Sequence, residues 1–406
     1  MPLHGRLIAP LAYFVEASAV DSGIMDSLMS VNLSADNIEL GESRSIDRSV
    51  MQVATCWEMD RRITELLPRF DAPFFQAGLA GYSDAAMRLV ARHHGCPYCV
   101  TEALLDTTLI SGGKGRTRED PDLLAAECGL GDPVHNRLGG LDDHPVAGQI
   151  MGSEPETMAK AAHLLIDMNY DVVDVNLACP VKKIRKRRRG GHFLAASDEA
   201  IAVLQAVYDA VDKRRPVTVK IRRAFEDSPE MERHFERIFD AAYEIGYAWA
   251  TVHCRTVVQK YVGPGRWTAL RNLVQRYPDR VIFGSGDIWE ATDIFHMLEY
   301  TGVHAVSVAR GCIGNPWIFQ QARSLMKGCS VDQPSITEQR EALLDHFTVS
   351  QRLHGDALAS KLMRKFGIKF SQHHPNADQV KKAFIECSSG AQWLKVINAH
   401  YPDTAS

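Results

Sequence analysis

The stretch from residue 146 to residue 176, VAGQIMGSEPETMAKAAHLLIDMNYDVVDVN, contains one complete strand–helix–strand unit. The apolar runs at 146–151 and 172–176 predict two buried strands. A helix is expected between them at 155–168, because apolar side chains recur there at helical spacing: Met158, Ala161, Ala162 and Leu165. A helical crossover between two buried strands is the unit from which parallel sheets are built.

The same alternation extends in both directions from this unit. It predicts eight strands, at 73–77, 98–102, 146–151, 172–176, 217–222, 249–254, 280–284 and 304–309. Eight such units over about 255 residues match the usual size of a closed (β/α)8 TIM barrel. A doubly wound open sheet is the alternative, but it rarely has eight parallel strands, and no Gly-x-Gly-x-x-Gly follows the first strand.

Strand patterns stop after residue 330, and helical patterns replace them. Ser335 and Glu338 have the spacing of a capping box and predict the start of a helix. Further helices are expected near 357–370, 377–388 and 391–399. We therefore expect a barrel domain at 71–330, followed by a small all-helical C-terminal domain at 331–406.

The N-terminal segment, residues 1–70, has little sustained periodicity and carries ten acidic against six basic residues. We expect a weakly structured extension there. It is either a regulatory segment or the product of a translation start assigned too early, with Met51 and Met59 as later starts. The formal charge of −4 argues against a nucleic-acid partner, but this segment accounts for all of it. Residues 71–406 are balanced, so the distribution of charge matters more than its total.

The composition is 45% hydrophobic and 24% charged, as in ordinary globular proteins, which excludes disordered and collagen-like classes. No apolar run approaches the roughly 18 residues that a membrane helix needs. Nine cysteines, odd in number and scattered, favour reduced thiols over a disulfide framework. We expect a cytoplasmic protein without a membrane segment.

Functional side chains of a barrel lie at the C-terminal ends of its strands, and these ends are polar and glycine-rich here. Lys220 lies within an apolar strand, where a buried ammonium needs a partner such as a cofactor carbonyl or phosphate. Gln149 offers both a donor and an acceptor in the third strand. The glycines at 284–288 and 309–317 predict a phosphate cradle, although ordinary turns between strand and helix also use glycine.

Cys179 follows the fourth strand in the sequence Asn176-Leu-Ala-Cys-Pro180. A lone cysteine is normally core packing, so a catalytic role and a packing role both stay open on the sequence alone. Cys96 and Cys99 form a single CxxC without a second pair, which favours a buried strand-start pair over a metal site. We expect no metal.

A dense basic run begins three residues after Cys179. It comprises Lys182, Lys183, Arg185, Lys186, Arg187, Arg188 and Arg189. Solvated faces normally mix charges of both signs, whereas this run contains no acid, which favours a polyanionic partner over an ordinary surface. In the C-terminal domain, one face of a predicted helix carries four further cations: Lys361, Arg364, Lys365 and Lys369. Both features would suit one large phosphate-bearing ligand.

Five motifs, taken together and in this order, resemble the tRNA-dihydrouridine synthases, most closely their bacterial B-type branch. They are Asn176-x-x-Cys-Pro-Val-Lys-Lys183, Val219-Lys-Ile-Arg222, Val252-His-x-Arg-Thr256, Gly286-Asp-Ile288 and Ala309-Arg-Gly-x-x-Gly-Asn-Pro-Trp-Ile-Phe319. The resemblance covers about residues 73–326 and continues more loosely through the helical tail.

This resemblance implies a barrel that uses FMN and NADPH to reduce uridine in tRNA to 5,6-dihydrouridine, with the helical domain gripping the RNA. It implies a flavin site formed by Gly78, Leu79, Gln149, Lys220 and His253, and a flavin-phosphate site formed by Ser285, Gly286, Asp287, Ala309 and Arg310. Reduced flavin would deliver hydride to carbon-6 of the uracil. Cys179 would protonate carbon-5 as a neutral thiol, which requires that nearby cations do not ionise it, and Asn176 would place the base.

The basic residues would then contact tRNA, and we expect the protein to act as a monomer. The chain departs from the family pattern at several places, with Gly78-Leu79 for Pro-Met, Ala178 and Cys254 for glycine, Ser285 for asparagine and Ala309 for glycine. The long polar stretch 112–144 is expected to form a lid or an RNA-facing insert.

Two alternative functions stay open: an FMN barrel acting on a free pyrimidine, such as a dihydroorotate or dihydropyrimidine dehydrogenase, and a flavin-less RNA-binding barrel. A small substrate would need neither the basic run nor the helical tail.

Overall fold

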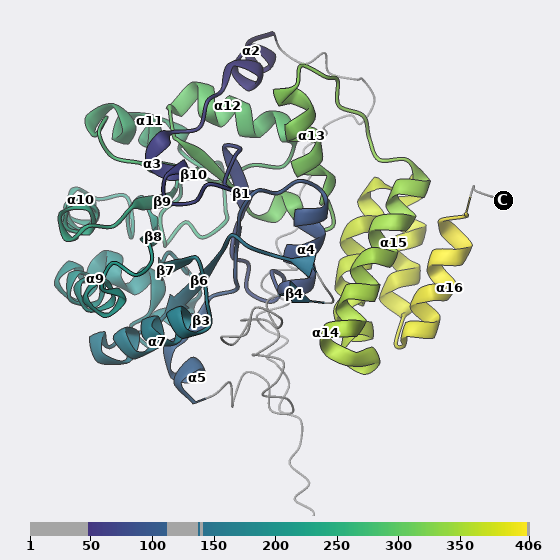
Figure 1. The fold of residues 1–406 in the computed structure, drawn as a ribbon, viewed down its shortest axis with the longest axis horizontal. Helices are drawn as coiled ribbons and strands as arrows, with labels where there is room; N and C mark the ends of the chain where they lie inside the picture. Colours follow the sequence, from purple (N-terminus) through teal and green to yellow (C-terminus); the bar gives the residue numbers. More distant parts are fainter. Residues whose placement is uncertain (1–47, 112–136, 139–140, 404–406) are drawn as a thin grey trace, which may run out of the picture. The chain divides into compact units, whose positions relative to one another are not determined.

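The computed structural model describes residues 48–111, 137–138 and 141–403. Its centre is a barrel of eight parallel strands: β1 (Phe74–Gln76), β2 (Cys99–Val100), β6 (Val146–Met151), β7 (Val172–Leu177), β8 (Val217–Arg222), β9 (Trp249–His253), β10 (Ile282–Ser285) and β11 (Ala305–Val308). The barrel is closed because β1 pairs with both β2 and β11, and β2 also pairs with β6 (Figure 1). The predicted TIM barrel is confirmed.

The second barrel strand differs from the single strand predicted at 98–102. After β2 ends at Val100, a separate strand, β3 (Leu104–Leu105), pairs further along the same edge of β6, with Leu104 opposite Ile150. Residues 101–103 lie between the two pieces. The hydroxyl of Thr101 accepts a hydrogen bond of 3.0 Å from the Gln149 backbone N–H there, so a side chain takes part in the strand pairing.

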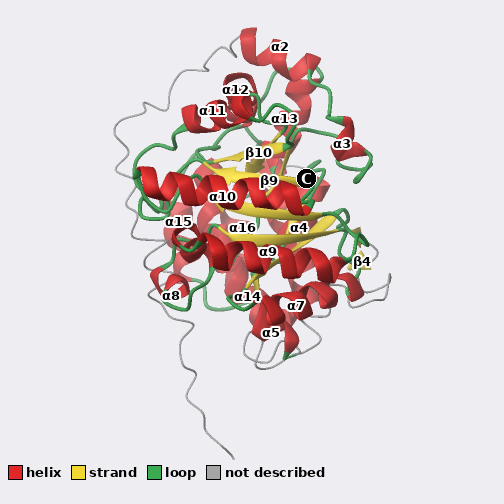
Figure 2. Cartoon of the chain, turned by 90° about the vertical axis from the view of Figure 1, so that its left-hand side faces the viewer, coloured by secondary structure: helices red, strands yellow, loops and turns green. Residues whose placement is uncertain are grey.

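Helices surround the strands on the outside, as Figure 2 shows. The long ones are α4 (Ala85–His93), α7 (Pro155–Asp167), α9 (Ser197–Val211), α10 (Pro229–Ile245), α11 (Trp267–Arg276), α12 (Ala291–Thr301) and α13 (Trp317–Met326). Short helices follow two strands, α5 (Asp106–Ile110) and α8 (Lys182–Arg185). The apolar face predicted for the third crossover is the buried face of α7. Within the described residues, no helix is long and apolar enough to cross a membrane.

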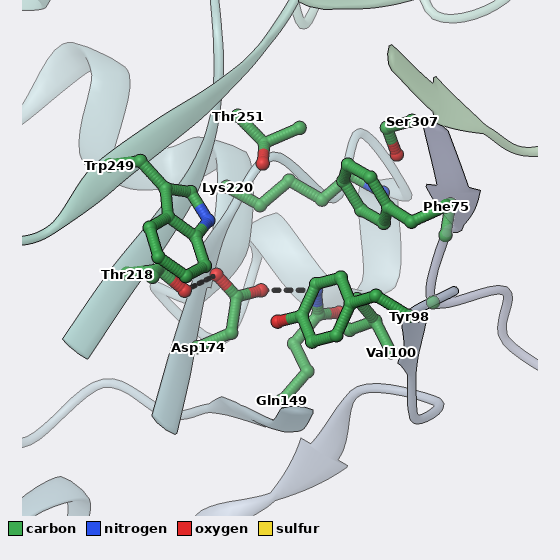
Figure 3. Close-up of a pocket in the computed structure, with 12 residues that line it drawn as sticks. Phe75, Tyr98, Val100, Gln149, Asp174, Thr218, Lys220, Trp249, Thr251 and Ser307 are labelled. Atoms are coloured by element: carbon green, nitrogen blue, oxygen red, sulfur yellow. Dashed lines mark hydrogen bonds between the residues drawn. The ribbon is translucent and has the colours of Figure 1, made fainter. Parts of the chain in front are cut away.

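The inside of the barrel has two chemically different layers. Near the N-terminal ends of the strands, aromatic rings fill it: Trp249 stacks on Phe283 at 5.1 Å between centroids, and Phe75 lies 5.3 Å from Tyr98. Nearer the C-terminal ends the side chains are polar: Gln149, Asp174, Thr218, Lys220, Thr251 and Ser307 (Figure 3). Polar groups therefore collect on the side of the barrel where chemistry is expected.

The segment before β1 closes the N-terminal end of the barrel. It contains α2 (Arg48–Cys56), which packs on α12 and α13, and α3 (Arg61–Thr64). After α3, the Phe70 ring stacks on Tyr98 at 4.8 Å and meets Phe283 edge to face at 5.9 Å. Ile63, Leu67 and Phe70 are all buried.

The expectation of a weakly structured extension over 1–70 is therefore wrong for residues 48–70. Too few apolar residues occur there to give a helical period, yet those present supply the floor of the barrel. Residues 1–47 lie outside the described part of the chain, so the expectation for them stays a prediction. Most of the 112–144 insert also lies outside it, apart from an antiparallel hairpin of β4 (Arg137–Leu138) and β5 (Leu141–Asp142).

Three helices follow the barrel: α14 (Ile336–Phe370), α15 (Ala377–Glu386) and α16 (Gly390–His400). The predicted capping box is present, because the Glu338 N–H donates to the Ser335 hydroxyl and the Ser335 N–H donates to the Glu338 carboxylate. Gly355, with φ of 70° and ψ of 165°, kinks α14, which explains why the sequence predicts two separate helices there. The three helices pack on one another around Trp393 and join the barrel in one compact unit.

We expect Phe70→Ala to lower the free energy of unfolding by about 3–5 kcal/mol, because it removes a ring from the closed end of the barrel. Leu66→Ala is the matched control: Leu66 lies in the same segment with 46% of its surface exposed, and should change stability by less than about 0.5 kcal/mol. Equal effects of the two changes in urea denaturation would show that this segment does not seal the barrel.

Candidate active site

The C-terminal ends of the strands bring together residues that lie far apart in the sequence. Gly78 from the loop after β1, Gln149 from β6 and Lys220 from β8 line one cavity, together with Asp174 and Thr218 (Figure 3). Three of the five predicted flavin residues, Gly78, Gln149 and Lys220, thus line one cavity, whereas Leu79 and His253 are not among its lining residues. Their role toward a flavin stays a prediction.

A chain of four polar side chains crosses the barrel interior. The Thr218 hydroxyl donates to Asp174 at 2.6 Å, and the Gln149 amide nitrogen donates to the other oxygen of Asp174 at 2.7 Å. The Gln149 carbonyl oxygen accepts from the Asn176 amide nitrogen, also at 2.7 Å. The oxygen of Asn176 then accepts from the backbone N–H groups of Ala178 (2.9 Å) and Cys179 (3.2 Å). The chain therefore fixes the backbone that carries the cysteine.

A buried carboxyl and a buried amine lie in this layer. Burial raises the pKa of Asp174, against the hydrogen bonds of Thr218 and Gln149 and the charge of Lys220. Burial lowers the pKa of Lys220, while the charge of Asp174 acts in the opposite direction. Within the described residues, the Lys220 amine has neither a hydrogen-bond acceptor nor an ion-pair partner. It is therefore available to an anionic or carbonyl ligand.

Burial raises the pKa of the Cys179 thiol, although Arg222 and Lys220 act to lower it. The thiol therefore stays protonated at neutral pH, as a proton donor must. Its loop is held closely: the Gly191 N–H donates to the Cys179 carbonyl oxygen at 3.0 Å. Gly190 has a φ of +56°, and a Cβ added there would lie 2.8 Å from the Cβ of Cys179. Only glycine fits beside the cysteine at this position.

Arg222 and Tyr261 belong to the site, although neither was among its predicted members. The Arg222 guanidinium is buried and donates to the carbonyl oxygens of Ala178 (2.8 Å), Thr256 (2.8 Å) and Lys260 (2.7 Å). It lies 5.5 Å from the Tyr261 ring centroid. Arg222 therefore ties the cysteine loop to the loop after β9. A sequence signal existed for Arg222, because positions 220 and 222 lie on the same face of a strand. We find none for Tyr261.

His253, at the end of β9, is neutral. Burial and four surrounding cations lower the pKa of His253 well below its ordinary value. Its Nδ1 accepts a hydrogen bond of 3.1 Å from the Arg255 N–H, which places the single ring proton on Nε2. His253 therefore offers a neutral N–H donor.

The predicted phosphate cradle assembles from the loops after β10 and β11. The Ser285 hydroxyl is buried, and no described residue hydrogen-bonds to it. Gly286 has a φ of +126°, and an added Cβ would lie 2.5 Å from the sulfur of Cys254. At Gly311 an added Cβ would lie 2.3 Å from the Ile288 carbonyl oxygen, so the two loops are in direct contact.

Two charged side chains complete this cradle. The Asp287 carboxylate accepts from Arg255 at 2.5 Å and from the Gly265 N–H at 2.6 Å, so it organises the loop and leaves only its backbone for an anion. The Arg310 guanidinium, which follows Ala309, lies between the rings of Tyr261 (5.3 Å) and Trp289 (4.6 Å). Its nearest anion is Asp287 at 3.8 Å. Three features of this cradle fit a phosphate group: the Ser285 hydroxyl without a partner among the described residues, the crowded glycine at 286 and the Arg310 guanidinium held by two rings.

The basic run after Cys179 forms α8 and the turn that follows it. Exposed side chains in the run are those of Lys182, Lys183, Lys186, Arg187 and Arg188. Arg188 pairs with Glu199. Arg189 lies 3.3 Å from the buried Asp106 and is itself 11% exposed, and Arg185 covers the ring of Phe225 at 5.4 Å. The prediction that all seven cations face RNA is therefore not supported for Arg185 and Arg189, which tertiary contacts turn inward.

The four cations predicted on one helix face also divide. Lys361, Arg364 and Lys369 are exposed on α14. Burial lowers the pKa of Lys369, and the charges of Lys381 and Arg310 add to this effect, which places Lys369 near the phosphate cradle. Lys365 instead donates to the Gly81 carbonyl oxygen in the loop after β1.

The predicted CxxC pair is buried at the start of β2, with sulfur atoms 3.8 Å apart. In the described part of the chain, no group of three or more histidine, cysteine or acidic side chains could hold a metal ion.

Comparisons with known proteins agree with this geometry. The family model for dihydrouridine synthase matches residues 75–405. A probable tRNA-dihydrouridine synthase of Treponema pallidum is 30% identical over 81% of this chain and 93% of its own length. A tRNA-dihydrouridine synthase B of Vibrio vulnificus is 26% identical over 81% and 96%. This chain also aligns with a solved structure of morphinone reductase, over 66% of this chain and 90% of that one, at 14% identity and with a TM-score of 0.45.

The family match includes nearly all of the barrel and the three C-terminal helices, so it does not rest on one motif. The chain therefore belongs to the dihydrouridine synthase family, and its curated relatives place it with the B-type branch.

Proposed function

We propose that this chain reduces uridine in tRNA to 5,6-dihydrouridine, with FMN as its flavin and NADPH as the source of electrons. The observation that carries the proposal is the protonated Cys179 thiol, which Asn176 holds at the same barrel mouth as Lys220 and the neutral His253. The curated relatives, whose names include this activity on tRNA, support it.

The residues at the mouth fit FMN. An added Cβ at Gly78 would lie 2.3 Å from the Thr101 carbonyl oxygen, so only glycine fits at this position of the cavity lining. Gln149, Lys220 and the Nε2–H of His253 offer polar groups to a ring, and the cradle at 285–287 and 309–310 offers a phosphate site. When bound, FMN supplies the hydride that adds to carbon-6 of the uracil.

Cys179 completes the reduction by giving its proton to carbon-5. The S–H bond breaks, a C–H bond forms and a thiolate remains. Arg222 and Lys220 are too weak to ionise the resting thiol against its burial, but their charges stabilise the thiolate once it forms. Asn176 holds the Cys179 backbone in place, so the thiol does not need to be ordered during the reaction.

The exposed cations suit tRNA. Lys182, Lys186 and Arg187 lie directly after the cysteine loop, and Lys361, Arg364 and Lys369 lie on α14. A target base extruded from an RNA loop could then enter the barrel mouth while phosphates meet these side chains. Neither group is needed for a free pyrimidine.

We expect Cys179→Ala to retain FMN binding and to lose about a hundredfold or more of its rate of dihydrouridine formation, since a general acid contributes roughly that much. The measurement is the rate at which the purified enzyme forms dihydrouridine in tRNA that has been isolated from a strain lacking this gene. Cys329→Ala, which alters an exposed cysteine, is the control and should be fully active. Full activity in Cys179→Ala would remove this residue from the mechanism.

The raised pKa of Cys179 predicts the pH dependence. The thiol must carry its proton, so activity is present below its pKa and is lost as pH rises through it. Because burial raises that pKa, the single-turnover rate of pre-reduced enzyme should stay level from pH 7 to about 8.5, the ordinary thiol value, and fall only above it. A decline that is already complete by pH 8 would contradict the protonated thiol.

For RNA binding, we expect the double change Lys182→Gln and Lys186→Gln to weaken tRNA binding. The slope of log Kd against log salt should fall by about 1.5, because roughly two phosphate contacts are lost. The matched control changes two exposed lysines that lie just after the barrel helices α9 and α13, Lys213→Gln and Lys327→Gln. If both pairs shift the slope equally, the basic run is ordinary surface.

A further inference from the structure

The loop at 78–84, which follows β1 and carries Gly78 and Leu79, is fastened at many points. Within it, the Leu79 carbonyl oxygen accepts from the N–H groups of Tyr82 (2.9 Å) and Ser83 (3.0 Å), and the Leu79 N–H donates to the Ser83 hydroxyl at 2.7 Å. From the barrel, the Glu102 carboxylate accepts from the Gly81 N–H at 2.7 Å. The backbone proposed to face the flavin is therefore shaped by its neighbours.

Helix α14, from the C-terminal bundle, contacts the same loop. The His354 Nε2 lies 3.2 Å from the Asp84 carboxylate, and both side chains are buried. The Phe366 ring meets the Tyr82 ring edge to face at 5.8 Å. Lys365 donates to the Gly81 carbonyl oxygen, and its ammonium lies 4.9 Å from the Tyr82 ring centroid. Figure 1 shows α14 beside α4, the helix that begins directly after this loop.

Gly81 is where the contacts from the two parts of the chain meet. Its φ of +77° is a conformation that glycine adopts readily, and it lies in the turn that the Tyr82 N–H closes on the Leu79 carbonyl oxygen. Its N–H is held by Glu102 of the barrel, and its carbonyl oxygen is held by Lys365 of α14. A charged donor makes a stronger hydrogen bond than a neutral one. Lys365 therefore restrains the turn that follows Gly78 and Leu79.

We propose that Lys365 is a positioning residue for the flavin: by holding Gly81, it keeps the backbone of 78–79 in the conformation that receives FMN. This inference rests on the proposed flavin site. It separates Lys365 from Lys361, Arg364 and Lys369, which share its helix face but stay exposed. It also makes the C-terminal bundle part of the cofactor site, in addition to any contact with RNA.

The test is titration of the full-length apoprotein with FMN, followed by the quenching of flavin fluorescence. Lys365→Met keeps the length of the side chain and removes its charge, and we expect it to raise the Kd for FMN about tenfold. Lys365→Arg, which still donates, should stay within about threefold of wild type. Lys395→Met, an exposed lysine on α16, is the matched control and should leave the Kd unchanged.

The outcomes separate the two proposals. An unchanged FMN Kd in Lys365→Met, with weaker tRNA binding in a filter assay, would overturn the inference and return Lys365 to the RNA surface. Wild-type protein that fails to bind FMN would overturn the proposed function itself. If Lys365→Met does not fold by circular dichroism, Lys365→Gln is titrated instead, and the same tenfold rise is required of it.

Discussion

A closed barrel of eight strands must fill its own interior, and this chain fills the two ends of that interior with different chemistry. Aromatic rings occupy the end where the strands begin, and Phe70 covers them from outside. Polar groups occupy the other end, where Thr218, Asp174, Gln149 and Asn176 hydrogen-bond one another, as buried polar groups must. The hydrogen-bonded chain from Thr218 to Asn176 is the result of that requirement. This series of hydrogen bonds ends on the backbone N–H of Cys179. The need to satisfy buried polar groups therefore also positions the residue that carries the reactive thiol.

The protonation state of Cys179 illustrates how two opposing effects combine at one atom. The nearby basic run suggests an ionised thiol, because cations favour the charged form. Most of those cations point into solvent, however, where their fields are screened, and the closer Arg222 and Lys220 are outweighed by burial. The basic run lies close to Cys179 in the sequence but has little effect on its pKa. Burial of the thiol and the distance to the charges determine its protonation state.

Much of the fold and much of the site could be predicted from the sequence, for identifiable reasons. Periodicity located the barrel strands and the kinked α14, because alternation and helical spacing are local properties. Periodicity did not reveal that residues 61–70 close the N-terminal end of the barrel, because their burial comes from contact with strands that are distant in the sequence. The cations of the basic run are alike in sequence pattern, and so are those on one face of α14, although Arg189 pairs with Asp106 and Lys365 donates to the Gly81 carbonyl oxygen. Spacing along a helix defines a face, and only the tertiary structure shows what that face meets.

The sulfur of Cys254 fills the space that glycines leave open at 265 and 286. A Cβ at Gly265 would lie 2.3 Å from that sulfur. The buried Cys254 side chain therefore touches both the loop after β9 and the loop after β10, so a single sulfur atom sets the spacing of the two loops that form this part of the phosphate cradle.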